Sequence, residues 1–571
     1  MKVANVQQQA LGAPVRSPLE ALRHWAQTTP DRVYMVQPQP DGAVVEYTWA
    51  QVWEQSRRMA AHLESLQLPP ASNVALYGKN SAHWIMADLA IWMAGHVSVP
   101  LYPTMGAESA RYVLEHCDAK LLVVGKLDGK TDSWHDVQAI LPATLPRLRL
   151  PLAPESAGRS WIELAASHAA LEAIDERDPE ALATIVYTSG TTGRPKGVMH
   201  CFRSLSAGCR VTANLWNTNA DDRMLSYLPL AHIAERVSLE VPSLVFGFSI
   251  FFNHGLETFQ DDLKRARPTR FFSVPRLWTR FYLGVHHQLP ADQQQALFAD
   301  PVRGPATKRQ ILASLGLDAA RIGFTGAAPL PQHITGWFRE LGLNLVECFG
   351  MSENAATSHA SPPGGAKPGR VGVPLPGVQC RISEAGEVLV KSPGQMLGYY
   401  RMPGQMEAET TPDGFFRTGD RGEIDTDGHL RITGRVKELF KTSKGRYVVP
   451  VPIENKLSLH PLVEAVCATG PGEPQPFALV MLPPDRQQAV GVSGPAREQL
   501  EQQFETLLSE VNAELEDHEQ LDYLVIVKDA WTIDNGLLTP TMKLRRSAIE
   551  QRYLGMAAGW RDSGRAVIWE E

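Results

Sequence analysis

Short apolar runs alternate with amphipathic segments along the first half of the chain. Three of these runs predict buried strands, at 74–77, 97–99 and 121–124. Thr48, with Gln51 three residues later, forms a capping box that predicts the start of a helix, and Ser81 predicts the start of another. A third helix is expected over 108–117. This alternation predicts parallel sheets covered by helices.

The pattern changes character near residues 434–437. Downstream, apolar residues recur at helical spacing from Leu500 to Leu515, and the opposite face of this expected helix is acidic. Short apolar runs around it predict strands, at 463–468, 477–482 and 523–527. We therefore expect a large N-terminal α/β domain of residues 1–436 and a small α+β C-terminal domain of residues 437–571. The proline-rich stretch 141–154 predicts a surface connection.

Composition excludes some classes of protein. With 55 basic and 62 acidic residues among 571, the chain has no basic excess that would favour a nucleic-acid partner. Its six cysteines form no CxxC pair, so neither a zinc site nor a disulfide framework is indicated. The N-terminal residues lack the apolar core of a signal peptide, and no apolar window is typical of a membrane span. We expect a cytoplasmic protein, and leave open peripheral attachment to the inner membrane face and a homodimer.

The candidate chemistry begins with the loop TSGTTGRPKG at 188–197, which follows an apolar run that predicts a strand. Its glycines permit close approach of the backbone, its N–H groups and hydroxyls are donors, and Lys196 adds a positive charge. Such a loop predicts a site for nucleotide phosphates. An ordinary polar turn is the plainer alternative, while a P-loop would need Ser or Thr directly after the lysine, where this chain has Gly197. The candidate ligand residues are Thr188, Ser189, Gly190, Thr191, Thr192, Gly193 and Lys196.

The loop resembles the signature of the adenylate-forming superfamily, which includes acyl-CoA synthetases, nonribosomal-peptide adenylation domains and beetle luciferases. Four further motifs carry the same resemblance: GAAPL at 326–330, ECFGMSEN at 347–354, RTGD at 417–420 with Gly434-Arg435 downstream, and DNGLLTPTMKLRR at 534–546. Taken alone, each has a plain structural alternative, such as a tight loop, a strand end or a solvated basic face. The superfamily implies stacked α/β sheets with a small β-barrel-like subdomain and a mobile C-terminal domain.

The resemblance implies roles for individual residues. Glu353 and Thr192 would hold Mg²⁺, and Lys543 would bridge the acyl carboxylate and the α-phosphate. Phe349 would stack on adenine, although tyrosine is commonest at this position. The remaining nucleotide contacts would come from Gly326, Ala327, Ala328, Gly350, Met351, Ser352, Asp420 and Arg435.

Motifs of the long-chain acyl-CoA synthetase branch imply three more sites. YLPLAHIAER at 227–236 places His232 beside an acyl pocket, although a lone histidine is equally often a satisfied core residue. VPRLW at 274–278 belongs to the same branch. KELFKTSKGRYVVP at 437–450 places Lys437 at a hinge, and Lys444 and Gly445 in a loop that approaches the thiol of CoA.

The implied reaction has two steps and uses ATP, Mg²⁺ and CoA. A medium- or long-chain fatty acid is converted to acyl-AMP with release of pyrophosphate, and the acyl group then passes to CoA as a thioester. Three alternatives stay open: transfer to a carrier protein in place of CoA, oxygenation of the acyl-adenylate as in luciferases, and a catalytically silent nucleotide-binding scaffold on the same fold.

Overall fold

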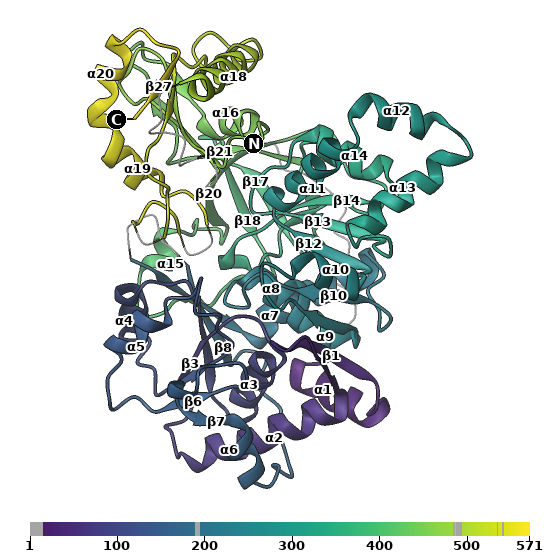
Figure 1. Cartoon of the computed structure of the whole chain (residues 1–571). Helices are drawn as coiled ribbons and strands as arrows, with labels where there is room; N and C mark the ends of the chain where they lie inside the picture. The colour runs from purple at the N-terminus through teal and green to yellow at the C-terminus, as the bar shows by residue number, and fades with distance from the viewer. Residues whose placement is uncertain are drawn as a thin grey trace.

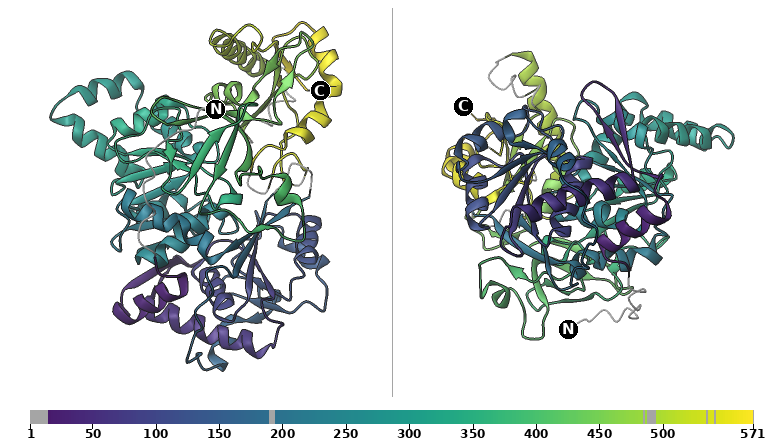
Figure 2. Two further views of the ribbon diagram at one scale, coloured as in Figure 1. Left: turned by 180° about the vertical axis from the view of Figure 1, so that it is seen from behind. Right: turned by 90° about the horizontal axis from the view of Figure 1, so that it is seen from below.

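The computed structural model describes residues 15–188, 194–483, 486, 494–533, 535–539 and 542–570. The chain forms a mixed α/β protein with a large N-terminal part and a smaller C-terminal part (Figure 1). The N-terminal helices α1 to α3 lie at one end of the molecule and the C-terminal elements at the opposite end, as the views in Figure 2 also show.

An eight-stranded sheet carries the predicted phosphate loop, and its strands are in the order β19-β9-β8-β4-β3-β5-β6-β7. The strands from β7 to β8 in this order run parallel, which confirms the prediction from the alternating pattern. Their bounds are β3 Asn73–Tyr77, β4 Val97–Leu101, β5 Leu121–Val124, β6 Arg147–Arg149, β7 Arg159–Ser160, β8 Leu182–Thr188, β9 Lys196–Cys201 and β19 Gly398–Tyr399.

The helices between these strands begin where the sequence predicts. Thr48 and Gln51 make both hydrogen bonds of a capping box at the start of α2, and the Ser81 hydroxyl accepts the Trp84 N–H at the start of α3. Every residue of α3 is buried, as its nearly continuous apolar sequence requires. The helices of this region are α2 Trp49–Ser65, α3 Ala82–Met93, α4 Ala107–His116, α5 Trp134–Ile140 and α6 Trp161–Ser167.

One prediction in this region is wrong. The stretch 141–154 contains β6, which pairs in parallel with β5, so it is not merely a surface connection. Leu148 and Leu150 are buried, while the arginines on either side of Leu148 are not. The alternating sequence RLRL is the signal of this strand, and the surrounding prolines masked it.

Two more sheets complete most of the N-terminal part. The first has the order β10-β11-β1-β2, with bounds β1 Val33–Pro38, β2 Val44–Thr48, β10 Arg223–Ser226 and β11 Ser249–Phe252. The second has the order β12-β13-β14-β15-β16, with bounds β12 Arg270–Ser273, β13 Ile322–Thr325, β14 Leu345–Phe349, β15 His359–Ala360 and β16 Val373–Pro374. The strands β12, β13 and β14 are parallel.

Helices flank these two sheets, and α12 and α13 project from the body of the molecule (Figures 1 and 2). The bounds are α1 Pro18–Thr28, α7 Phe202–Leu215, α8 Ile233–Glu235, α9 Val241–Phe246, α10 Phe259–Ala266, α11 Pro275–Gln288, α12 Ala291–Ala299, α13 Arg303–Ser314 and α14 Gln332–Glu340. One turn of π-helix, η2 (Arg236–Glu240), joins α8 to α9. No helix in the described ranges combines the length and the apolarity needed to cross a membrane.

An antiparallel sheet connects the N-terminal part to the C-terminal part. Its strand order is β17-β18-β20-β21, with bounds β17 Gln379–Ile382, β18 Glu387–Lys391, β20 Phe416–Ile424 and β21 Leu430–Arg435. It lies where the resemblance implies a small β-barrel-like subdomain. A short helix, α15 (Gln405–Ala408), precedes β20.

The C-terminal part has the predicted α+β character and a buried apolar core of its own. Its four-stranded sheet has the order β24-β25-β26-β27, and the helix expected around Leu500 to Leu515 is α18. The bounds are β22 Phe440–Lys441, β23 Tyr447–Val448, α16 Pro450–Leu457, β24 Ala465–Thr469, β25 Phe477–Met481, α18 Pro495–Asn512, β26 Leu524–Ile526, α19 Arg546–Tyr553, α20 Ala557–Asp562 and β27 Val567–Trp569.

Candidate active site

Strands β8 and β9 hold the two ends of the predicted phosphate loop. Thr188, the last residue of β8, pairs with Lys196, the first residue of β9. The loop residues Ser189, Gly190, Thr191, Thr192 and Gly193 lie outside the described residues, so their role stays a prediction. The Lys196 ammonium pairs with the Glu409 carboxylate at 3.1 Å and lies 4.8 Å from the centre of the Tyr399 ring.

Tyr399 links the phosphate-loop lysine to the candidate metal ligand Glu353. Its hydroxyl lies 3.0 Å from Glu353 Oε1 and 2.6 Å from Glu409 Oε2. A tyrosine has one hydroxyl proton, so it donates to one of these two carboxylates at a time. Burial raises the pKa of Glu353; the charge of Glu409 adds to this effect, while the Tyr399 hydrogen bond and Arg435 oppose it. The arrangement therefore disfavours the ionised form of Glu353, whereas hydrogen bonds from Tyr399 and Lys196 lower the pKa of Glu409.

The segment after β14 positions the candidate adenine-binding residues. Phe349 ends the strand and is half-buried, with its ring 5.9 Å from the His359 ring. A Cβ at Gly350 would lie 2.5 Å from the Ala356 carbonyl oxygen, so only glycine fits there. The Met351 N–H donates to Asn354 Oδ1 at 3.0 Å, which shapes the turn containing Glu353.

The carbonyl of Ser352 is fixed from another sheet. The buried His200 side chain on β9 donates to it through Nε2, at 2.7 Å. This contact ties the Glu353 turn to the strand that begins with Lys196.

The loop at 326–328 follows β13, the neighbour of β14, so both candidate adenine contacts lie at the carboxyl ends of adjacent parallel strands. A Cβ at Gly326 would lie 3.2 Å from the Cys348 carbonyl oxygen. Ala327 and Ala328 are exposed, and Ala327 has a left-handed φ of 70°. The Glu347 carboxyl group accepts a hydrogen bond from the backbone of Leu330, which anchors the loop. Burial raises the pKa of Glu347 to about 7, and this hydrogen bond opposes the shift.

Asp420 and Arg435 lie opposite each other on β20 and β21, and their side chains form an ion pair at 2.9 Å. Burial raises the pKa of Asp420, while Arg435 and then Lys543 oppose this shift. The pair offers a carboxylate and a guanidinium side by side, which suits hydroxyl groups and phosphate oxygens of a nucleotide.

Lys543 reaches this cluster from the segment just before α19. The Lys543 side chain is exposed to solvent. The protein around it nevertheless displaces part of its hydration, and this desolvation is the largest cause of its lowered pKa. Arg435 lowers this pKa further, whereas Asp420 and Glu353 raise it. The structure therefore brings together a C-terminal lysine and three candidate site residues of the N-terminal part.

His232 also lies within electrostatic range of Lys543. Its Nδ1 accepts the Ala234 N–H at 3.1 Å, so the ring caps α8. Burial, and then the charge of Lys543, lowers the pKa of His232 to about 4. The ring is therefore neutral near pH 7 and offers a hydrogen-bonding group rather than a positive charge.

The remaining predicted residues lie elsewhere in this structure. Lys437 is exposed in the turn that follows β21. Lys444 and Gly445 lie in the hairpin between β22 and β23, where the Lys444 ammonium donates to Gln475 Oε1 at 3.1 Å.

A magnesium ion fits this site in one binding mode. Among the described residues, no group of three or more His, Cys, Asp or Glu side chains is placed to hold a metal by itself. Mg²⁺ commonly binds through one or two carboxylates together with substrate phosphates and water. Glu353, a carboxylate joined through Tyr399 and Glu409 to the phosphate-loop lysine, fits that mode.

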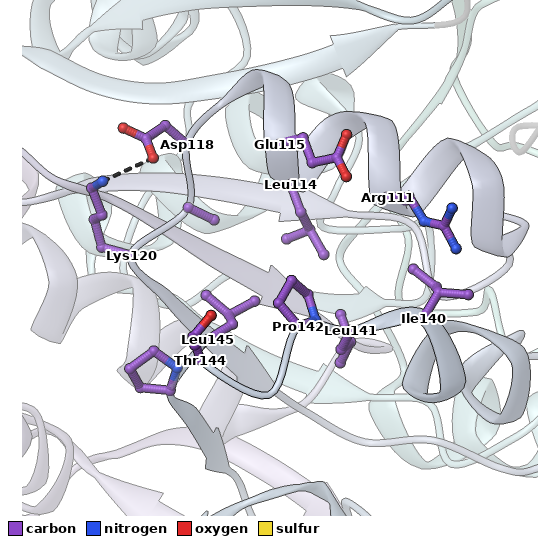
Figure 3. Close-up of a pocket in the computed structure, with 12 residues that line it drawn as sticks. Arg111, Leu114, Glu115, Asp118, Lys120, Ile140, Leu141, Pro142, Thr144 and Leu145 are labelled. Carbon is purple, nitrogen blue, oxygen red and sulfur yellow. Dashed lines mark hydrogen bonds and ion pairs between the residues drawn. The ribbon is translucent and has the colours of Figure 1, made fainter.

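A cavity of about 280 Å³ lies away from these residues, between α4 and the segment 140–146 (Figure 3). Leu114 and Leu145 contribute apolar surface to it, and Arg111 and Lys120 stand at its charged edge. None of the predicted site residues lines it, so it is not the candidate active site.

Sequence reasoning missed the residues that support the site. Tyr399, Glu409 and His200 all contact a predicted site residue, yet none belongs to a motif that we singled out. Glu347 begins the motif ECFGMSEN, but we assigned it no role. A tyrosine in the segment GYYR with a glutamate ten residues later was the available signal for the first pair.

Comparison with known proteins identifies the family. The profile of the AMP-binding enzyme family matches residues 22–400, and that of the AMP-binding enzyme C-terminal domain matches residues 438–556. The chain belongs to the AMP-binding enzyme family.

Its relatives include long-chain-fatty-acid–CoA ligases. The chain is 29% identical over 561 residues to the ligase FadD15 of Mycobacterium bovis, covering 90% of this chain and 92% of the relative. It is 28% identical over 580 residues to long-chain-fatty-acid–CoA ligase 1 of Homo sapiens, covering 90% and 82% of the two chains.

Solved structures establish the fold. The anthranilate CoA ligase AuaEII in complex with anthranoyl-AMP matches with a TM-score of 0.76 at 19% identity, over 96% of this chain and 99% of that one. The A-PCP didomain of carboxylic acid reductase from Segniliparus rugosus, in complex with AMP, matches with a TM-score of 0.77 at 20% identity, over 98% and 83%.

Proposed function

We propose that this protein is an ATP-dependent acyl-CoA synthetase that activates a medium- or long-chain fatty acid as acyl-AMP and transfers the acyl group to CoA. The observation that carries the proposal is that Lys543 lies within electrostatic range of Asp420, Arg435 and Glu353. The names of the relatives, long-chain-fatty-acid–CoA ligases from a bacterium and from human, support the substrate class.

The first step needs alignment and charge neutralisation rather than a base. A fatty acid carboxylate is already a nucleophile, and repulsion between it and the triphosphate is the main obstacle. Lys543 faces both anions in this proposal, and their binding raises its pKa and keeps it charged. Mg²⁺, when bound beside Glu353, supplies further neutralisation of the phosphates.

The other residues bind and orient. Asp420 accepts hydrogen bonds from the ribose, and Arg435 holds Asp420 in place and faces phosphate oxygens. Phe349 and the loop 326–328 enclose the adenine from two sides. His232, neutral at pH 7, would lie beside the acyl group in this proposal.

We also propose a division after Val436, with residues 437–571 moving as a unit about Lys437. In the arrangement observed here, Lys543 is at the site, which suits the first step. The second step requires the hairpin with Lys444 and Gly445 to approach the CoA thiol, and a rotation about one short connection allows that exchange.

The experiment is a pyrophosphate-release assay with ATP, Mg²⁺ and carboxylic acids of graded chain length, with and without CoA. We expect release with medium or long chains, and a thioester product when CoA is present. Pyrophosphate release without thioester formation in the presence of CoA would instead favour transfer to a carrier protein or oxygenation of the acyl-adenylate. No release with any acid would leave a silent nucleotide-binding protein and refute the proposal.

Lys543→Ala is expected to slow adenylation by about 10²-fold or more, because one well-placed electrostatic donor is lost. Conversion of supplied acyl-AMP to the thioester should be spared. Arg565→Ala is the matched control, since it removes an exposed cation of the same domain. Pyrophosphate release at the wild-type rate by the Lys543 variant would contradict the assigned role.

A further inference from the structure

The C-terminal part contacts the N-terminal part at a second place, away from Lys543. Glu464, immediately before β24, forms an ion pair with Arg276 in the first turn of α11. Leu459, just after α16, packs against the apolar cluster that contains Trp278 and Phe338. Arg276 belongs to the motif VPRLW, to which the proposed reaction gives no task.

Both ends of this contact are rigidly supported. On one side, Trp278 is fully buried and its indole N–H donates to the Phe324 carbonyl at 3.3 Å, which fixes the start of α11. On the other side, the Glu464 N–H donates to the Met481 carbonyl at 2.9 Å, which fixes this residue to the C-terminal sheet. The ion pair therefore joins two separate cores and not two loose loops.

We propose that Arg276 and Glu464 are positioning residues that hold the C-terminal domain in the orientation that brings Lys543 to Asp420 and Arg435. The inference rests on the proposed two-step function. A body attached only through the connection at 436–437 is free to rotate, whereas a second contact at Glu464 favours one orientation. Rotation toward the thioester-forming arrangement must break this pair.

The exposure of the pair suits a contact that opens in every cycle. The side chain of Arg276 is 47% exposed and that of Glu464 is 27% exposed, so water solvates both ions as soon as they separate. Such a pair biases the orientation without locking it.

The test compares the two half-reactions in Glu464→Lys, which places two cations face to face. We expect adenylation, followed as pyrophosphate release, to slow by roughly two- to five-fold, the range for loss of an exposed pair. Thioester formation from supplied acyl-AMP and CoA should keep the wild-type rate or exceed it. The exchanged pair Arg276→Glu with Glu464→Arg should restore adenylation to within about two-fold. Glu505→Lys, an exposed reversal on α18 of the same domain, is the matched control.

A second measurement does not depend on activity. Deuterium uptake at 456–464 in the absence of substrates should rise in Glu464→Lys and stay unchanged in Glu505→Lys. Equal slowing of both half-reactions, adenylation at the wild-type rate or unchanged deuterium uptake would overturn the inference. If the wild-type protein formed no acyl-AMP, the proposed function would fail, and the deuterium experiment would still decide whether the pair holds the domain.

Discussion

Replacing Arg236 by methionine would remove the cation from a buried cluster of charges beside the candidate site. Arg236, Asp88 and Glu240 have no exposed side-chain surface. The guanidinium lies 2.5 Å from Asp88 Oδ2 and 3.0 Å from Glu240 Oε2, and it donates to Thr184 Oγ1 at 3.0 Å. Thr184 is on β8, so Arg236 ties the turn that follows His232 to the strand that leads into the phosphate loop.

The magnitude follows from burial. Removing one partner of a buried ion pair costs about 3–5 kcal/mol, because the other charge is left unpaired. A domain of about 420 residues has an unfolding entropy near 0.9 kcal/mol/K, so the expected loss is about 3–6 °C in the melting temperature of the N-terminal part. An exposed pair offers the comparison: Arg203→Met, which breaks the pair with Glu180, should change the melting temperature much less than Arg236→Met does.

The loss of stability caused by Arg236→Met should increase as pH rises. Burial raises the pKa of both Asp88 and Glu240, and Arg236 opposes both shifts. Without Arg236 both values rise further, so the folded variant holds protons more tightly than the unfolded chain does. A carboxyl group whose pKa is raised in the folded state destabilises it increasingly as pH rises. The difference in melting temperature between wild type and Arg236→Met should therefore be larger at pH 8 than at pH 5.5.

Scanning calorimetry or circular dichroism at the two pH values measures this difference. A variant that also carries Asp88→Asn and Glu240→Gln should recover part of the loss and lose the pH dependence. A loss below about 1 kcal/mol, or a larger loss at pH 5.5, would refute the reasoning.

Two further predictions concern the site itself. Tyr399→Phe removes a hydrogen bond that lowers the pKa of Glu353. The acid limb of the pH–rate profile of pyrophosphate release should therefore move to higher pH while the protein stays folded. An unmoved profile would contradict the role of the Tyr399–Glu353 hydrogen bond. Gly350→Ala places a Cβ 2.5 Å from the Ala356 carbonyl oxygen, so the apparent affinity for ATP, measured by titration, should fall by about ten-fold or more. Gly336→Ala is the control, because its Cβ meets open space and the affinity for ATP should stay unchanged.

The sequence predicted best those features that are local. Thr48 with Gln51, and Ser81, begin helices because their side chains bond to backbone groups only three residues away, and such bonds need no tertiary partner. The strand at 147–149 was missed since its short alternation lies among prolines and its pairing with β5 and β7 depends on the rest of the sheet. In the same way, Tyr399 and Glu353 are 46 residues apart, and only folding brings their oxygens to 3.0 Å.

The candidate residues came mainly from resemblance, and their electrostatic state came from the structure. The sequence around Glu353 and Glu347 does not indicate that burial raises the pKa of each carboxyl group. The electrostatic interaction of Lys543 with Asp420 likewise depends on the orientation of the C-terminal part. A sequence motif identifies a candidate residue, whereas the protonation state of its side chain depends on neighbours that are distant in sequence.

Two ion pairs differ in how strongly they resist separation during the domain movement that we propose. Arg236 with Asp88 and Glu240 is fully buried, so separating these charges costs about 3–5 kcal/mol and the turn after His232 stays attached to β8. Arg276 with Glu464 is partly exposed, so separating them costs about 0.2–1 kcal/mol, and thermal energy breaks the pair readily. The rotation that we propose for the C-terminal domain would therefore break the exposed pair and leave the buried cluster intact. The proposed movement of Lys543 into and out of the site would then need no rearrangement of the residues that we propose to hold the nucleotide.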